Sequence, residues 1–230
     1  MSSLFPPKIQ KGRKMAVYRL EENKIYFPDP TLANDDGLLA VGGDLSVERL
    51  VLAYSNGIFP WFNKDSPILW WCPKERFIIR PEKIHVSSSM KKFFKKHDVY
   101  IRINRDFADT IHRCRTKREF TVGTWITDDM EKAYIRMYEN NLALSVESYI
   151  DGKLAGGLYG VCLGKCFFGE SMFSDMENGS KVALILFSKF LKLNDFVMID
   201  CQFHTNHLES MGGEYISWEE YKELLSNIKN

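Results

Sequence analysis

The sequence predicts an α+β fold with a mixed, mostly antiparallel central sheet. Apolar runs joined by short turns between residues 143 and 171 indicate strands that pair antiparallel, with Asp151-Gly152 as a hairpin turn. The strand–helix–strand pattern from 165 to 202 indicates one parallel pair. This mixture of helices with both kinds of strand pairing is typical of an α+β fold.

The bulk composition is that of an ordinary globular protein and excludes several classes. The 230 residues are 45% hydrophobic and 27% charged, and the net charge is +1, so any nucleic-acid contact has to come from a local basic patch. No apolar run approaches the ~20 residues of a membrane span, and the first residues lack the apolar stretch of a signal peptide. Five cysteines without a Cys-x-x-Cys pair do not indicate a disulfide framework, so we expect a cytoplasmic protein without membrane contact.

The first part of the chain reads as loops followed by a helix. Residues 28–44 are rich in Pro, Asp and Gly, which indicates turns. A helix is expected over 45–56, because Asp44 or Ser46 can cap its start and Gly57 can end it.

A domain boundary is expected after this helix. The aromatic stretch 58–62 is unusual for an exposed loop, and we place the boundary just beyond it. Residues 1–65 would form a small N-terminal domain and residues 66–230 a larger one. The strands expected in the larger domain are 68–71, 76–80, 99–103, 143–150, 154–162, 165–171 and 195–202. The helices expected there are 88–97, 106–116, 128–140, 179–192, 205–211 and 218–228.

The strand expected near residue 200 carries polar groups in an apolar run. Residues 196–203 read FVMIDCQF, so Asp200 and Gln202 would project from the same face, roughly 7 Å apart along the strand. A buried carboxylate needs a partner or a chemical role. The alternative is an Asp at a strand end that is bonded to backbone donors.

A second apolar strand repeats this pattern. Residues 166–173 read CFFGESMF, and Phe168, Glu170 and Met172 would share one face. Gly169 indicates a bulge or a close backbone approach at this point. Two carboxylates and an amide in apolar strands predict a polar site inside a hydrophobic pocket.

A basic face is expected on the helix over 88–97. Its four lysines fall within an arc of about 140° of the helix, opposite the apolar side chains. The face is either a solvated surface or a patch that contacts phosphates. The lysines are Lys91, Lys92, Lys95 and Lys96.

A metal site is not expected. Cys201, His204 and His207 have a zinc-like spacing, but a structural zinc needs a fourth ligand and a catalytic zinc needs three well-placed ones. Cys201 would also face the apolar side of its strand.

Seven segments taken together resemble the leucyl/phenylalanyl-tRNA–protein transferase family. They stand in the family's order over roughly residues 25–217. They are GLLAVGGDLS (37–46), GIFPWF (57–62), ILWWCP (68–73), GTWIT (123–127), GGLYGV (156–161), FGESMFS (168–174) and IDCQ (199–202).

This resemblance implies a fold and a reaction. The fold would be a small N-terminal α/β domain followed by a domain like that of the acetyl-CoA-dependent N-acetyltransferases. The reaction would move Leu or Phe from aminoacyl-tRNA to the N-terminal Arg or Lys of an acceptor protein, which then enters N-terminus-directed degradation. The resemblance implies a monomer that needs no cofactor.

The resemblance also assigns site residues. Asp200 and Gln202 match the family's catalytic pair, Glu170 matches its acidic site residue, and the four lysines match its tRNA-facing patch. The positions that would line the aminoacyl pocket and the terminal-adenosine site are Trp61, Trp125, Phe167, Met172, Phe187 and Ile199. Two further pocket positions depart from some members and leave the preference between Leu and Phe open: Leu158 and Leu191.

The implied chemistry is aminolysis of an ester. The ester bond already activates the donor, and an α-amine with a pKa of about 7.7–8.0 is partly neutral near pH 7.5. A strong general base is therefore unnecessary, and we expect Asp200 to accept a hydrogen bond from the amine while Gln202 orients it. Glu170 would either balance the charge of the acceptor's basic side chain or have a structural role.

Two other functions are alternatives to this one. An acetyl-CoA-dependent N-acetyltransferase would mark its pyrophosphate site with Gln/Arg-x-x-Gly-x-Gly/Ala before a helix, and the sequence lacks that pattern. A non-catalytic tRNA-binding module would need the basic face and the tryptophans, but not Asp200, Gln202 or Glu170.

Overall fold

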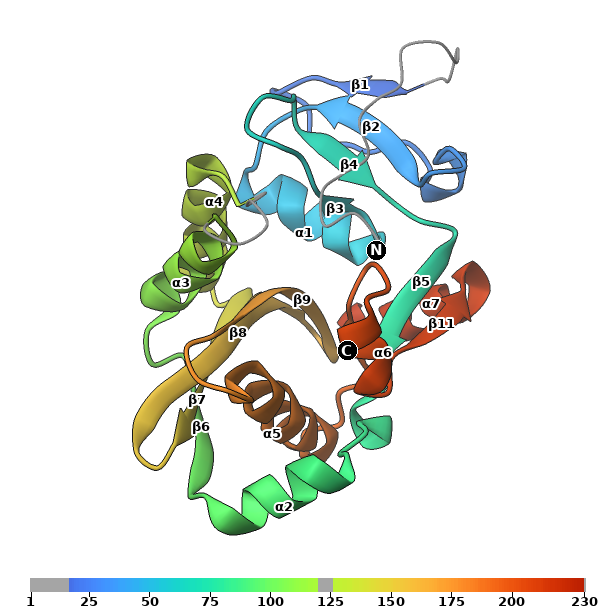
Figure 1. Ribbon diagram of the computed structural model, residues 1–230. Helices are drawn as coiled ribbons and strands as arrows, with labels where there is room; N and C mark the ends of the chain where they lie inside the picture. Colours follow the sequence, from blue (N-terminus) through green and yellow to red (C-terminus); the bar gives the residue numbers. More distant parts are fainter. Residues whose placement is uncertain (1–16, 120–125, 230) are drawn as a thin grey trace.

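Two β-sheets and seven α-helices make up the described part of the chain. The structure is a computed structural model that describes residues 17–119 and 126–229. The smaller sheet has the strand order β1-β2-β4-β3, and the larger one has the order β11-β5-β10-β9-β8-β7-β6. In Figure 1 the smaller sheet lies at the top, and the larger sheet runs below it from β11 to β6.

The bounds of the elements are as follows. The smaller sheet comprises β1 Tyr18–Leu20, β2 Leu38–Gly42, β3 Phe59–Pro60 and β4 Leu69–Trp71. The larger sheet comprises β5 Glu75–Ile79, β6 Val99–Ile103, β7 Ala143–Ile150, β8 Lys153–Leu163, β9 Cys166–Ser174, β10 Met198–Asp200 and β11 Glu214–Ser217. The helices are α1 Val47–Ser55, α2 Ser88–Lys96, α3 Phe107–Glu119, α4 Asp128–Glu139, α5 Gly179–Leu193, α6 Asn206–Ser210 and α7 Trp218–Leu225.

The pairing of the larger sheet confirms the expected mixed, mostly antiparallel arrangement. β9 and β10 pair in parallel across α5, and the other neighbouring strands pair antiparallel. The hairpin between β7 and β8 turns at Asp151 and Gly152, whose φ angles are 50° and 77°. The likeness of this domain to the N-acetyltransferases stays a prediction.

Several short strands were not predicted. β2 lies within 28–44, which was expected to consist of loops, and β1, β3 and β11 were also missed. Each has at most five residues, so little alternation is present to identify it. The domain boundary near residue 65 stays a prediction, and β4, which pairs with β2 and β3, lies beyond it.

Helices cover both faces of the larger sheet. α5 packs on one face, and α3 and α4 pack on the other (Figure 1). The apolar cluster on the α3 and α4 face continues into the smaller sheet and α1, so the two sheets share one core. No helix within the described ranges is long and apolar enough to cross a bilayer.

Candidate active site

Asp200, at the end of β10, is fully buried and forms an ion pair with Arg76 of β5. The guanidinium donates through Nε to Asp200 Oδ1 at 2.9 Å and through Nη2 to Oδ2 at 2.8 Å. The hydroxyl of Tyr221, on α7, donates to Oδ2 at 2.6 Å. None of the three residues is more than 1% exposed, so the pair is shielded from solvent.

Two aromatic rings enclose the Arg76 guanidinium. Its central carbon lies 4.5 Å from the ring centre of Phe59 and 4.8 Å from that of Tyr221. Burial lowers the pKa of Arg76, but the Asp200 carboxylate outweighs this and raises it above its ordinary value. The cation–π contacts and the ion pair therefore keep a charged guanidinium inside the protein.

Asp200 also holds the backbone of Gln202. The Gln202 N–H donates to Asp200 Oδ1 at 2.9 Å, and the Gln202 backbone is left-handed with a φ of 59°. In the orientation that its surroundings require, the Gln202 amide nitrogen donates to the carbonyl oxygens of Cys201 and Gly169, each at 3.0 Å. Because a non-glycine residue at positive φ needs support from its surroundings, Asp200 fixes the turn that carries Gln202.

Glu170 lies on β9 at a bulge, where the pairing register with β8 shifts. Its Oε1 is 2.7 Å from the hydroxyl of Tyr54 on α1, and its Oε2 is 2.9 Å from the hydroxyl of Tyr134 on α4. Burial is the largest influence on the pKa of Glu170 and raises it to about 7. The residue as a whole is half-buried.

The three predicted polar residues therefore lie in one connected group. Asp200 pairs with Phe168 across the parallel β9–β10 ladder, two residues before Glu170. The contact of the Gln202 amide with Gly169 joins the turn after β10 to the strand that carries Glu170.

Two expectations about strand faces were wrong. β10 ends at Asp200, so Gln202 lies beyond the strand and does not follow its alternation. Met172 belongs to the apolar cluster on the α5 face, whereas Phe168 belongs to the opposite one. The bulge at Glu170 adds a residue between them and reverses the alternation.

Six of the predicted pocket residues share the apolar cluster on the α5 face of the sheet. Phe167 and Phe187 pack edge to face with ring centres 4.8 Å apart. Met172 is the one member of the six that keeps part of its surface exposed; the others are at most 2% exposed. The six are Leu158, Phe167, Met172, Phe187, Leu191 and Ile199.

The two predicted tryptophans do not join this cluster. Trp61 packs on the other side of the sheet, with its ring centre 4.9 Å from that of Phe203, which follows Gln202. Trp125 lies outside the described residues.

The four lysines of α2 are exposed, as a basic surface requires. α2 lies beside α5, where Lys189 is 5.6 Å from the ring centre of Phe94 (Figure 1). Through its apolar side, helix α2 therefore packs beside the helix that covers the apolar cluster, and its lysines face solvent.

Four residues that support the site were not predicted. Arg76 stands as a charge inside an apolar strand, and this signal could have identified it. Tyr54, Tyr134 and Tyr221 lie on ordinary amphipathic helices, where a buried tyrosine cannot be told from core before the fold is known.

The spacing of Cys201, His204 and His207 does not produce a ligand cluster. Nε2 of His204 lies 3.0 Å from Oε2 of Glu209. Within the described ranges, no group of three or more His, Cys, Asp or Glu residues is arranged to hold a metal ion.

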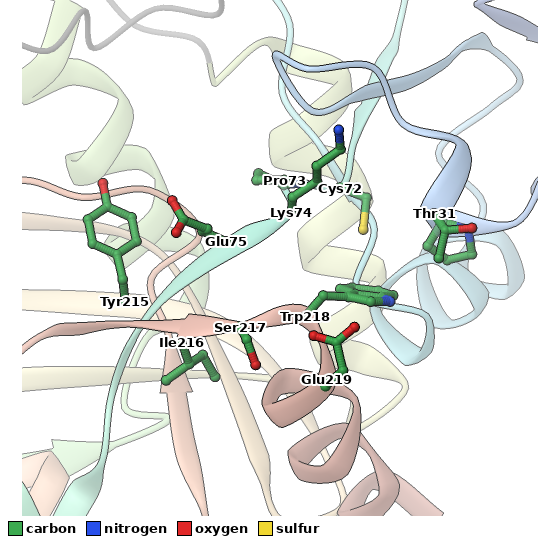
Figure 2. A pocket seen from close by; sticks show the side chains of 11 residues that line it. Thr31, Cys72, Pro73, Lys74, Glu75, Tyr215, Ile216, Ser217, Trp218 and Glu219 are labelled. Carbon is green, nitrogen blue, oxygen red and sulfur yellow. The ribbon is translucent and has the colours of Figure 1, made fainter.

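A separate hollow of about 460 Å³ opens between the start of β5 and the start of α7 (Figure 2). Trp218 forms part of its wall, and the Trp218 ring centre is 5.9 Å from that of Tyr221. Cys72 also lines it, and burial raises the pKa of that thiol to about 11. Its lining contains none of the predicted site residues, so this hollow is distinct from the predicted aminoacyl pocket.

Comparison with known proteins gives a consistent result. Residues 78–226 match the family model described as leucyl/phenylalanyl-tRNA protein transferase, and residues 43–74 match the model for the N-terminal domain of that protein. A leucyl/phenylalanyl-tRNA–protein transferase from Desulfatibacillum aliphaticivorans is 51% identical over 201 residues, which cover 87% of this chain and 86% of that protein. The protein of the same name from Syntrophus aciditrophicus is 49% identical and covers 87% of this chain and 84% of its own length. Among solved structures, L-PGS from Bacillus licheniformis matches 82% of this chain and 64% of that chain with a TM-score of 0.44 and 10% identity.

Proposed function

Since this chain belongs to the leucyl/phenylalanyl-tRNA–protein transferase family, which moves an aminoacyl group from tRNA to a protein N-terminus, we propose that its acceptors begin with Arg or Lys. The donors are tRNAs that carry Leu or Phe, and the products enter N-terminus-directed degradation. The protein works as a monomer in the cytoplasm.

The reaction makes modest demands on acid–base chemistry. The amine nitrogen attacks the ester carbonyl carbon and the bond to the terminal ribose oxygen breaks. The proton that the amine loses as the amide forms is balanced by the proton that the ribose oxygen takes up as it leaves as a hydroxyl. Because an α-amine has a pKa of about 7.7–8.0, a useful fraction is neutral without a strong base. Placing the amine beside the ester therefore supplies most of the rate increase.

Gln202 is the residue that contacts the amine in this proposal. Its amide nitrogen is already bonded to Cys201 and Gly169, and its amide oxygen accepts a hydrogen bond from the attacking amine. Asp200 has no exposed surface and both its oxygens are bonded, so the direct contact with the amine that we expected does not fit this geometry. Asp200 instead positions Gln202 through its backbone N–H.

The donor side chain binds at the apolar cluster beside α5, entering next to Met172, the one member of the six with exposed surface. All members of the cluster are apolar, so only shape and buried area can distinguish one donor side chain from another. One methylene contributes only ~0.8 kcal/mol of burial. Such a pocket separates Leu from Phe weakly, which is consistent with the use of both. Met172 is partly exposed, and its unbranched side chain adapts to either group.

The basic face of α2 binds the tRNA. Its four lysines are exposed on a helix that lies beside α5, so one tRNA end can contact the lysines while its aminoacyl group enters the cluster. Trp61 provides an aromatic surface near the Gln202 turn on which a terminal base can stack.

A transfer assay tests this function. Charged tRNAs carrying Leu, Phe, Ile or Val are offered to peptides that begin with Arg, Lys or Ala. We expect transfer of Leu and Phe to the Arg and Lys peptides, and none to the Ala peptide. Tight tRNA binding without transfer, or acetyl transfer from acetyl-CoA, would contradict the proposal.

A further inference from the structure

Three short contacts join Glu170, Tyr54 and Tyr134 into a closed ring. Glu170 Oε1 lies 2.7 Å from the Tyr54 hydroxyl oxygen, Glu170 Oε2 lies 2.9 Å from the Tyr134 hydroxyl oxygen, and the two hydroxyl oxygens are 2.6 Å apart. Each distance is that of an O–H···O hydrogen bond, which needs one proton between its two oxygens. The ring therefore needs three protons.

The two tyrosines supply only two of these protons. Burial raises the pKa of Tyr54 and of Tyr134 well above the ordinary value, so both hydroxyls stay protonated. An ionised Glu170 is an acceptor only, and one of the three pairs would then be two lone pairs facing each other at less than 3 Å. A protonated Glu170 supplies the third proton and completes the ring.

We propose that Glu170 in the substrate-free protein is a neutral carboxylic acid held in a three-proton ring with Tyr54 and Tyr134, and that a basic acceptor side chain binds by displacing this proton. The second half rests on the proposed function. When the acceptor binds, the Glu170 O–H bond breaks and the proton passes to the solvent buffer. The carboxylate that is left pairs with the acceptor's guanidinium or ammonium group.

The surroundings of Glu170 favour a neutral acid that can still ionise. Tyr54 faces it from α1 and Tyr134 from α4, while Asp200 of β10 and Arg76 of β5 act on it with opposite signs. Burial is the largest influence and places the pKa of Glu170 at about 7, so displacement of the proton near neutral pH costs little.

A titration of the substrate-free protein tests the ring. The infrared band of a protonated carboxyl is followed from pH 5 to pH 9 as a difference between the wild type and Glu170→Gln. We expect the band at pH 6, and we expect it to disappear with a midpoint near pH 7. Absence of the band at pH 6 would overturn the proposal.

The variant Tyr134→Phe shows whether the hydrogen-bonded ring, and not burial alone, keeps Glu170 protonated. It leaves one contact between Glu170 and Tyr54, and the Tyr54 proton alone satisfies that contact. The midpoint should therefore fall by about one pH unit. If Glu170 were instead an ionised carboxylate that accepts from both tyrosines, loss of one donor would raise the midpoint of the titration. A higher midpoint in Tyr134→Phe would therefore contradict the proposed ring. Tyr138→Phe makes the same change one turn later on α4, where Tyr138 stacks on Phe107, and should leave the midpoint unchanged.

Calorimetry tests the displacement step. An Arg-starting peptide is titrated into the protein at pH 6 in buffers with different heats of ionisation. The wild type should release about one proton more per bound peptide than Glu170→Gln. Equal release would overturn the displacement step. Failure of transfer to the same peptide, with the infrared band intact, would contradict the proposed function and not the ring.

Discussion

Both oxygens of Asp200 are bonded to protein groups, and this decides how the residue can act. Arg76, Tyr221 and the Gln202 N–H all donate to a carboxylate with no exposed surface. A group in this position cannot meet a substrate, but it can set the conformation of the residue that does. At the residue scale, Gln202 and Glu170 therefore make the substrate contacts in the proposed function, and Asp200 supports Gln202 through its backbone N–H.

Breaking the Arg76–Asp200 pair should strongly destabilise the protein. Asp200→Leu leaves a buried guanidinium without its partner, and we expect a loss of about 3–5 kcal/mol in the free energy of unfolding. The double variant Arg76→Met, Asp200→Leu should recover most of this loss, because no unpaired charge is left. Denaturant unfolding measures both, and a double variant that is less stable than the single one would contradict the account.

The same pair of variants separates stability from turnover. The double variant lacks the acceptor for the Gln202 N–H, so its transfer rate should stay low although its stability returns. Wild-type turnover in the stabilised double variant would show that Asp200 does not position Gln202.

Glu170 should make stability depend on pH. Its folded pKa of about 7 lies above the ordinary 4.5, so it contributes stability that is fully present below pH 4.5 and is lost as the pH rises through 7. The melting temperature of the wild type relative to Glu170→Gln should therefore fall between pH 5 and pH 8. Thermal melts of both proteins check this. A difference in melting temperature that stays constant or rises with pH would contradict the prediction.

At the element scale, the bulge in β9 and the left-handed turn after β10 bring the polar groups together. The bulge depends on a close backbone contact. A Cβ at Gly160 would lie 2.1 Å from the carbonyl oxygen of Phe168 on the partner strand, whereas a Cβ at Gly152 would meet nothing within 4 Å.

Gly160→Ala should therefore destabilise the protein more than Gly152→Ala. The second change still places a Cβ at a positive φ of 77° and costs of order 1 kcal/mol. The first requires the β8–β9 ladder to move apart, so we expect several times that cost. Equal losses in denaturant unfolding would indicate that the bulge is not tightly packed.

The basic face of α2 should control the salt dependence of tRNA binding. If the four lysines contact four phosphates, log K should fall with log salt concentration with a slope of about −3 to −4. Lys91→Ala together with Lys95→Ala should weaken this slope by about 2 without lowering stability, because a like-charge pair at i and i+4 is removed. Lys222→Ala, an exposed lysine on α7, is the control and should leave the slope unchanged.

The elements and the site were not equally predictable from the sequence. Asp200, Gln202 and Glu170 stood out because polar residues are rare in apolar strands, and α1 was marked by Ser46 and Gly57. Arg76 contacts Asp200 across 124 positions of the chain, and no local pattern reports such a contact. The predicted face of Met172 was wrong because the bulge at Glu170 shifts the alternation of the side chains that follow it along β9.

At the scale of the whole molecule, the site draws on both ends of the described chain. Tyr54 comes from α1 beside the smaller sheet, and Tyr221 comes from α7 near the C-terminal end. The apolar cluster that underlies them extends from Leu20 to Leu225 and includes residues of both sheets. The two parts should therefore unfold together.

A single unfolding transition is the expected consequence. In a Trp125→Phe, Trp218→Phe variant the remaining tryptophans are Trp61, Trp70 and Trp71, which lie in or next to the strands of the smaller sheet, so their fluorescence reports on that sheet. Far-ultraviolet circular dichroism is dominated by the helices, most of which pack on the larger sheet. Both signals should change at the same denaturant concentration. Two separated transitions would show that the shared core does not couple the sheets.

The central claim is that Gln202 holds the attacking amine beside the ester. Single-turnover transfer of Phe from tRNA to an Arg-starting peptide, at saturating concentrations of both, measures this step directly. For Gln202→Ala we predict a rate about 100-fold below that of the wild type, with unchanged affinity for aminoacyl-tRNA. A wild-type rate in this variant would contradict the claim.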